Sequence, residues 1–315
     1  MAKSITTSGL DIQRNYICMA QYSSRDASVK YICLVPLPIS ADFAAGSDTA
    51  GYWGAVAAEL RKIRKNVRFT GPDVACSLPC DMVITRALEA ESDDPDQAAA
   101  LRWELAASLP APANEYVFDF YEVDPGHSID RRRYIAAAAR TETMTYLNKA
   151  VGGAKLSPNI IDIDLFALTH TFKANYRERI GETSILLHGE LRRTKMLLLH
   201  NSSYVAHHIV DFNAEGCSAT DYAAMLRAES ALLMDTGAAV CDIVNNGDGA
   251  ATYLAGALFT DPAFSTDLLA ALPRCELLDP FRKVGCDAMD DERKAIHSPQ
   301  VAVAVGMALR AEEAS

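Results

Sequence analysis

The chain lacks a Cys-x-x-Cys pair, an apolar run long enough to span a bilayer, and an apolar signal segment after Met1. Cys76 and Cys80 flank a Leu-Pro turn, which is poor spacing for zinc ligands. The cysteines, at positions 18, 33, 76, 80, 217, 241, 275 and 286, show no repeating spacing. We therefore expect no metal site, and a soluble, reduced, cytoplasmic protein that reaches a membrane only through a partner.

Positive charge is also in deficit. The sequence has 30 Lys and Arg residues against 41 Asp and Glu residues, which gives a formal net charge of −11. Binding to nucleic acid needs a contiguous basic face, so this balance argues against nucleic acid as a partner. Basic clusters at residues 61–65, 131–133 and 192–195 are predicted to be solvated faces or hairpin tips. With 50% hydrophobic residues, the 315-residue chain can form sizeable cores in about two domains.

An intact phosphate-binding motif is missing as well, although two incomplete copies of one are present. In the intact motif an apolar strand ends in Asp-Ile-Gly or Asp-Leu-Gly. The Asp orients a metal-bound water, and the Gly lets backbone N–H groups approach a phosphate. The first copy, at residues 9–20, keeps Asp11 but has Gln13 in place of Gly. The second, at residues 185–199, keeps Gly189 but has Leu187 in place of Asp. This pattern predicts a duplicated fold whose nucleotide cleft has lost its function.

Each copy begins a similar series of predicted elements. The first unit has strands, a helix and a strand at residues 5–12, 16–21, 31–35, 51–66 and 74–78. The second has the same series at residues 183–187, 195–199, 204–210, 218–234 and 240–244. Three antiparallel strands, a helix and a parallel strand form the ribonuclease-H-like unit that actin-like proteins contain twice.

The rest of the second unit is predicted from turn and cap signals. A glycine turn with Gly247 and Gly249 enters a helix at residues 250–259. The final helix is expected to start at Ser298, which would cap it, with Pro299 at its first position.

Residues 79–157 form an insertion with its own strand–helix–strand–strand–helix order. We therefore predict an α/β fold in three parts. The first lobe comprises residues 1–78 and 158–180, the inserted α+β subdomain residues 79–157, and a reduced second lobe residues 181–315.

The order of elements resembles the type IV pilus assembly protein PilM family, which is related to the bacterial division protein FtsA. No single segment decides the resemblance, but their order and spacing over nearly the whole chain are specific. The segments are Gly-Leu-Asp-Ile at 9–12, Val-Ala-Cys-Ser-Leu-Pro at 74–79, Leu-Arg-Trp-Glu at 101–104, Leu-Pro at 109–110, and those at 117–121, 134–139, 156–168, 278–281 and 301–310. The resemblance implies an actin-like ATPase fold, with two ribonuclease-H-like lobes and an α+β subdomain inserted in the first.

The chain departs from this family at its nucleotide positions and in its second half. The nucleotide-binding positions that the resemblance implies, all vestigial, are Asp11, Gln13, Gly189, Gly247 and Gly249. Residues 211–239 leave room for a turn and one helix, where the family has a subdomain that closes over adenine and ribose. We expect no cofactor and no catalytic residue, with ATP and magnesium as the alternative.

Other polar residues near these motifs have structural interpretations. Arg192, Arg193 and Lys195 are predicted to be exposed hairpin charges rather than substitutes for the missing cation, and His188 a structural histidine in an apolar strand. Aspartates at positions 73, 162 and 164 are assigned to strand ends or helix caps. His207 and His208 point to opposite faces of a strand and therefore cannot bind one metal together.

The resemblance implies a cytoplasmic scaffold of a type IV pilus or related secretion machine, peripheral to the inner membrane. Its expected partners are the N-terminal tail of a PilN-like membrane protein and other platform proteins, and it could form homo-oligomers. Tyr116, Phe118 and Phe120 in the insertion could line a peptide groove or belong to the core. One alternative is an actin-like ATPase. A second is a component like the type II secretion protein GspL, which the lack of a transmembrane segment argues against.

Overall fold

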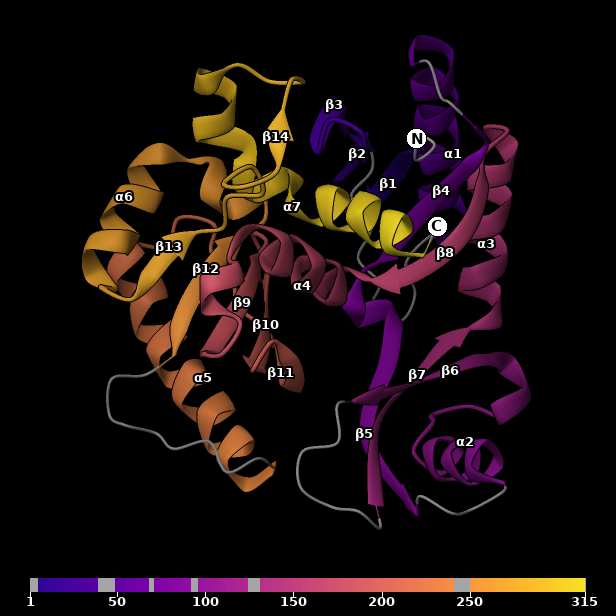
Figure 1. Cartoon of the computed structure of the whole chain (residues 1–315). Coiled ribbons are helices and arrows are strands. Elements are labelled where there is room, and N and C mark those ends of the chain that lie inside the picture. The colour runs from indigo at the N-terminus through magenta and orange to yellow at the C-terminus, as the bar shows by residue number, and fades with distance from the viewer. Residues whose placement is uncertain are drawn as a thin grey trace.

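The computed structural model describes residues 5–38, 49–67, 71–91, 96–123, 131–240 and 250–314. These residues form two lobes, each with a mixed sheet, and a smaller subdomain that extends from the first lobe (Figure 1). The predicted α/β, actin-like architecture of two related lobes is confirmed by this arrangement and by the structural comparisons given below.

The first lobe contains a six-stranded sheet in the order β14-β3-β2-β1-β4-β8. β1 is antiparallel to β2 and parallel to β4, and β4 is parallel to β8. Helices α1 and α3 pack against each other, and α4 and α7 lie side by side between the lobes (Figure 1). The elements are β1 Thr6–Ile12, β2 Tyr16–Ser23, β3 Ser28–Pro36, α1 Thr49–Asn66, β4 Asp73–Leu78, α3 Thr141–Gly153, β8 Ser157–Ile163, α4 Asp164–Asn175, β14 Gly285–Cys286 and α7 Asp291–Glu313.

The second lobe repeats the pattern in a five-stranded sheet ordered β11-β10-β9-β12-β13. β9 is antiparallel to β10 and parallel to β12, as β1 is to β2 and β4. This common pairing is the structural counterpart of the repeated sequence motif. The elements are β9 Thr183–Gly189, β10 Arg193–His200, β11 Ser203–Asp211, α5 Ala219–Val240, β12 Ala251–Ala255, α6 Pro262–Ala271 and β13 Cys275–Leu277.

The inserted subdomain consists of an antiparallel sheet in the order β5-β7-β6 and one helix. Helix α2 covers the face on which even-numbered residues lie, and there Tyr116, Phe118 and Phe120 belong to a small core with Leu101 and Leu105. The core interpretation of these aromatic residues is therefore the correct one. The elements are β5 Val83–Glu91, α2 Gln97–Ala107, β6 Tyr116–Val123 and β7 Arg131–Arg140.

The chain returns to the first lobe after completing the second sheet. β14 pairs with β3, and α7 packs on β1, β2 and α4, although residues 285–313 fall within the predicted range of the second lobe. Helix α3, predicted to belong to the insertion, packs mainly on α1. The predicted domain limits stay predictions, but these sheet and helix contacts place residues 141–153 and 285–313 with the first lobe.

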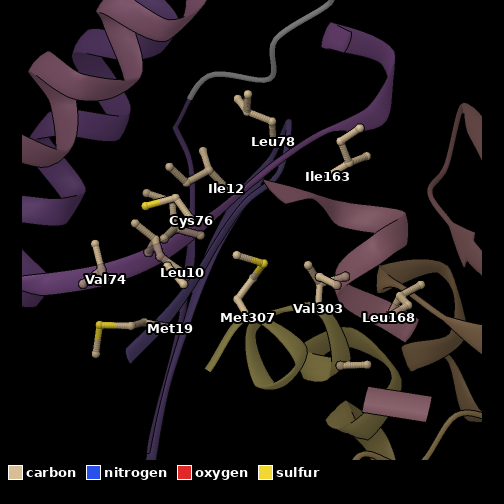
Figure 2. Close-up of a cluster of buried hydrophobic side chains, with 14 of the residues drawn as sticks. Leu10, Ile12, Met19, Val74, Cys76, Leu78, Ile163, Leu168, Val303 and Met307 are labelled. Carbon is tan, nitrogen blue, oxygen red and sulfur yellow. The ribbon is translucent and has the colours of Figure 1, made fainter. Parts of the chain in front are cut away.

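The main core lies where the strands of the first lobe meet the helices. Figure 2 shows Leu10, Met19 and Cys76 from the sheet together with Val303 and Met307 from α7. α7 approaches the sheet closely, because an added Cβ at Gly9 would overlap the carbonyl oxygen of Ala304. Glycine is therefore required at position 9 for packing.

Two predicted elements in the second half are wrong, and a third, the strand at residues 240–244, lies almost entirely outside the described residues. Of that strand only Val240 is described, and it is the last residue of α5. The helix predicted at 250–259 is instead strand β12, followed by a turn at Gly256 with φ of 107°. Ser298 does not start the last helix, because α7 begins at Asp291 and the Asp290 carboxylate caps it by accepting from the Arg293 backbone N–H at 2.8 Å.

These errors have identifiable physical causes. The segment Ala-Thr-Tyr-Leu-Ala is a short apolar run, whose periodicity does not distinguish a buried strand from a helix. Ser298 and Pro299 match the cap and first-position pattern of a helix start, but Pro299 lies within α7. Its carbonyl oxygen accepts from the Gly256 backbone N–H at 2.8 Å, which links α7 to the turn after β12.

Candidate functional site

The ends of parallel strands from both lobes converge on one buried polar site. In the first lobe β1 ends at Ile12, β4 at Leu78 and β8 at Ile163, and in the second lobe β9 ends at Gly189. In open α/β sheets ligands bind at the carboxyl ends of parallel strands, particularly where the chain order reverses. The predicted positions Asp11, Gln13 and Gly189 therefore lie where the topology places a ligand site.

Asp11 is fully buried at the end of β1. Its Oδ1 accepts hydrogen bonds from Ser77 Oγ at 2.7 Å and Gln13 Nε2 at 2.8 Å. Its Oδ2 has no hydrogen-bond partner among the described residues. Burial raises the pKa of Asp11 to about 6, although the charge of His188 and the Ser77 hydrogen bond oppose the change.

Gln13 places a side chain in the space between two carboxylates. Its amide nitrogen lies 2.8 Å from Asp11 Oδ1 and 3.5 Å from Asp164 Oδ2, and its backbone carbonyl accepts from the Tyr52 hydroxyl at 2.9 Å. Gln13 is fully buried. It thus joins the ends of β1 and β8, at a position where the intact motif has only backbone.

Gly189 is needed for packing within the second lobe. An added Cβ at this position would lie 2.6 Å from the Phe259 ring. An added Cβ at Gly256 would overlap the carbonyl oxygen of Gly189. The glycine turn that follows the parallel strand is therefore at Gly256, whereas the predicted Gly247 and Gly249 lie outside the described residues. The Ala-Gly pair after the apolar run of β12 was the sequence signal for it.

Lys195 is the principal residue of the site that sequence analysis misjudged. It was predicted to be an exposed hairpin charge, but its side chain is 0% exposed. Its Nζ lies 2.7 Å from Asp164 Oδ2 and 2.7 Å from Glu190 Oε1. Burial would lower the pKa of Lys195, yet the carboxylates of Asp164 and Glu190 raise it well above its usual range. Lys195 is therefore a buried ammonium ion held by two carboxylates.

The two carboxylates that bind Lys195 come from opposite lobes, Asp164 from the first and Glu190 from the second. Asp164 Oδ1 accepts from the backbone N–H groups of Cys80 at 3.0 Å and Leu165 at 2.8 Å, which leaves Oδ2 for Lys195. Asp164, predicted to lie at a strand end or helix cap, is the first residue of α4 directly after β8, and it also binds Lys195. Burial would raise the pKa of Glu190, but the charge of Lys195 lowers it far below its usual range.

A second ion-pair group lies beside the first. Asp81 Oδ2 bonds to Arg14 and to Arg193, and Arg193 also pairs with Asp211 at 2.6 Å. Burial would raise the pKa of Asp81, but the charges of Lys195 and Arg14 keep it lowered. Because Asp81 follows β4 and Arg193 begins β10, this group also connects the lobes.

The histidines have different surroundings. His188 is fully buried, and its Nδ1 lies 3.6 Å from Glu190 Oε1, beyond ordinary hydrogen-bond distance. His207 Nε2 is 2.9 Å from Thr85 Oγ1, and His208 Nδ1 is 3.0 Å from Glu229 Oε2. Within the described ranges no group of three or more His, Cys, Asp or Glu side chains is arranged to hold a metal ion.

Leu187 lies on the opposite side of its strand from the site. It packs in the apolar core of the second lobe with Met196 and Tyr222. The second copy of the motif therefore contributes a hydrophobic side chain to this core, while the polar groups near its turn are His188, Glu190 and Lys195.

The comparisons with known proteins agree with this fold. The family model described as type IV pilus assembly protein PilM matches residues 9–185. The chain belongs to this family. The match covers the first-lobe sheet as far as β8, the inserted subdomain and the start of β9, so it ends just before Glu190, Arg193 and Lys195. The resemblance inferred from the sequence is confirmed.

Solved structures extend the likeness to the rest of the chain. One chain of a PilM–PilN type IV pilus biogenesis complex is 22% identical with a TM-score of 0.75, covering 96% of this chain and 98% of that chain. The cytoplasmic domain of EpsL, an inner-membrane component of the type II secretion system of Vibrio cholerae, is 11% identical with a TM-score of 0.50, covering 98% and 94%. A comparison with curated protein sequences finds no match. Among the described residues, no helix is both long and apolar enough to cross a membrane.

Proposed function

We propose that the chain is a scaffold of a type IV pilus assembly platform that binds the N-terminal cytoplasmic tail of a PilN-like protein. In this proposal it lies at the cytoplasmic face of the inner membrane through that partner and turns over no nucleotide. The main support for the proposal is membership of the PilM family, together with a likeness over the whole chain to a protein from a PilM–PilN complex. The less specific form of this proposal is that the chain belongs to a type IV pilus or a related secretion machine. The likeness to EpsL supports this broader role.

The inserted subdomain offers a surface suited to an extended tail. The face of its sheet opposite α2 is formed by odd-numbered residues of the three strands. On β6 this face exposes Val117 to 46% and Tyr121 to 68%. Tyr121 pairs across the sheet with Ile135, which is buried beside it. Asp119 lies exposed between Val117 and Tyr121 on the same face, so the strip pairs two apolar side chains with a carboxylate, and its apolar side chains supply contacts for a bound peptide.

β6 also has the backbone groups that such a peptide needs. In the described part of the sheet, β6 pairs only with β7, so its other edge is open. An edge strand presents free N–H and C=O groups to which a peptide can add as a further strand. Val117 and Tyr121 would then lie beneath alternate side chains of the tail, since both point to the same face.

The polar site supports a role without nucleotide turnover. A magnesium nucleotide needs a free carboxylate for the metal and open backbone for the phosphates. Here Asp164 is committed to Lys195 and to two backbone N–H groups, and the Gln13 side chain fills the space beside Asp11. These residues do not suit a magnesium ion with its phosphates, and no catalytic step is assigned to them.

The test is calorimetric titration of the folded full-length protein with a synthetic peptide from the cytoplasmic N-terminus of a PilN-like protein of the same organism. We expect saturable binding that Tyr121→Ala weakens at least about tenfold, as for an aromatic anchor. Trp103→Ala is the matched control, because Trp103 is 76% exposed on α2, away from the strip. A folded protein that does not bind the peptide contradicts the proposal.

One observation favours the alternative of an ATP-binding protein. Asp11 Oδ2 is buried and has no partner among the described residues, as a group awaiting a ligand would be. Calorimetric titration with ATP and magnesium separates the two functions. Micromolar binding that is abolished by Asp11→Ala would replace the scaffold proposal with a nucleotide-dependent one.

A further inference from the structure

Two pairs of opposite charges cross between the lobes at the hairpin formed by β9 and β10. Lys195 and Arg193 lie two positions apart on β10 and thus on the same face of the strand. Each meets a carboxylate of the first lobe, Asp164 for Lys195 and Asp81 for Arg193. The second lobe therefore presents two cations to two fixed anions of the first.

We propose that the Lys195 ammonium group is the resident cation of this inter-lobe site, where it binds Asp164 and Glu190 and holds the two lobes closed without an added ligand. Nucleotide-binding proteins of two lobes close when a ligand contacts both sides of the cleft. In this chain a side chain makes contacts on both sides. The proposal does not depend on the proposed function, since it concerns the lobes and not the tail.

The burial of Lys195 is the first argument. An ammonium ion withdrawn from water is strongly unfavourable unless paired and hydrogen-bonded. Lys195 is 0% exposed and lies 2.7 Å from a carboxylate oxygen on each side. One partner, Asp164, is itself fully buried and belongs to the other lobe. Separation of the lobes would therefore break the Lys195–Asp164 pair, leaving Lys195 with Glu190 alone and Asp164 with its two backbone N–H groups.

The rigidity of Asp164 is the second argument. Two backbone N–H groups, from Cys80 after β4 and Leu165 in α4, bind its Oδ1. These bonds direct Oδ2 toward Lys195, and the Gln13 amide lies 3.5 Å from the same oxygen. A carboxylate held in this way is a prepared cation site, and Lys195 is the cation that occupies it.

Arg193 and Asp81 strengthen the closure at the edge of the site. The Arg193 side chain is 21% exposed, so its ion pairs are screened more than those of Lys195. Arg14 of the first lobe binds the same oxygen of Asp81 and approaches Glu190 Oε2 at 4.0 Å. Lys195 therefore forms the more buried of the two ion-pair links between the lobes, beside the apolar core that they share, and the arginines extend these links toward solvent.

The experiment compares hydrogen–deuterium exchange of the full-length protein with that of Lys195→Ala. The matched control is Arg192→Ala, which removes an exposed cation from the same hairpin. We expect Lys195→Ala to speed exchange at least about tenfold in segments of both lobes, around residues 77–82 and 164–168 as well as 186–196. Small-angle scattering should show a larger radius of gyration for Lys195→Ala alone.

Two further measurements test the proposal if Lys195→Ala folds poorly. Ethylammonium ions should enter the vacated space between Asp164 and Glu190 and restore protection, whereas sodium at equal ionic strength should not. The double variant Lys195→Ala/Asp164→Asn should fold better than the single variant, because it removes one of the two carboxylates, Asp164 and Glu190, that lose their cation.

Three results would overturn the proposal. The first is faster exchange confined to residues 186–196, which would mean that Lys195 stabilises only its own hairpin. The second is exchange in Lys195→Ala equal to that of Arg192→Ala. The third is a single variant that is unfolded and is restored neither by ethylammonium nor by Asp164→Asn.

Discussion

Replacing Asp11 by Asn should stabilise the protein at neutral pH. Burial raises the pKa of Asp11 from 3.8 to about 6, so the folded protein binds a proton there more tightly than the unfolded chain does. Stability therefore falls as pH rises from about 4 to about 6, and above this window the ionised carboxylate destabilises the folded state. A pKa difference of this size corresponds to about 3 kcal/mol.

An asparagine at position 11 can keep the hydrogen bonds that the Asp11 side chain makes. Its Oδ1 can accept from Ser77 and Gln13 as the carboxylate does, and its amide replaces Oδ2, which has no partner among the described residues. The free energy of unfolding should then rise by about 1–3 kcal/mol at pH 8, because a buried N–H without a partner offsets part of the stabilisation. At pH 4 the carboxyl group is protonated, and the gain should nearly vanish.

Urea unfolding at pH 4 and pH 8, followed by far-ultraviolet circular dichroism, measures both values. Asp267→Asn on the exposed side of α6 is the control and should change stability by less than about 0.5 kcal/mol at either pH. An Asp11→Asn variant less stable than the parent at pH 8 would refute the reasoning. It would mean that Asp11 is ionised for a purpose, such as holding a cation.

Two further substitutions test how the returning C-terminal segment packs on the first lobe. Gly306→Ala should lower the free energy of unfolding by about 3 kcal/mol or more in thermal unfolding, because its Cβ would overlap the Ala167 carbonyl oxygen. Gly54→Ala, on open helix surface, should raise the free energy of unfolding by about 0.5–1 kcal/mol. A stable Gly306→Ala protein would show that α4 and α7 can separate easily. Asn175→Ala should lose about 3 kcal/mol in urea unfolding, because the buried Asn175 Oδ1 accepts from the Val284 backbone N–H at 3.1 Å and so holds the segment that returns to the first lobe. Unchanged stability would contradict that role.

The elements that sequence analysis predicted correctly are those with local signals. The two hairpins around Asp11 and Gly189 combine apolar strands with short polar turns, and both are present as β1–β2 and β9–β10. The family resemblance supplied the two-lobe architecture, which the repeated hairpin alone only suggested. The insertion was recognisable because its strands alternate and its helix ends at a Leu-Pro pair.

The predictions from sequence that were wrong concern residues whose role depends on partners far away in the chain. Lys195 follows two other polar residues near a turn, so its sequence context predicted solvent exposure. Asp164, 31 positions earlier in the chain, becomes its partner only when the lobes close. The available signal was the position of Lys195 directly before the apolar run of β10, which begins at Met196. Similarly, nothing local indicates that β14 returns to β3.

That return determines the order in which the protein can fold during synthesis. Domains usually fold as they leave the ribosome, the first one first. Here α7 covers β1 and β2, and β14 pairs with β3, although residues 285–313 are made after the entire second lobe. The earliest strands thus wait with one apolar surface uncovered until almost the whole chain has been translated. The part synthesised first is completed last, and nascent chains need protection from aggregation throughout that interval.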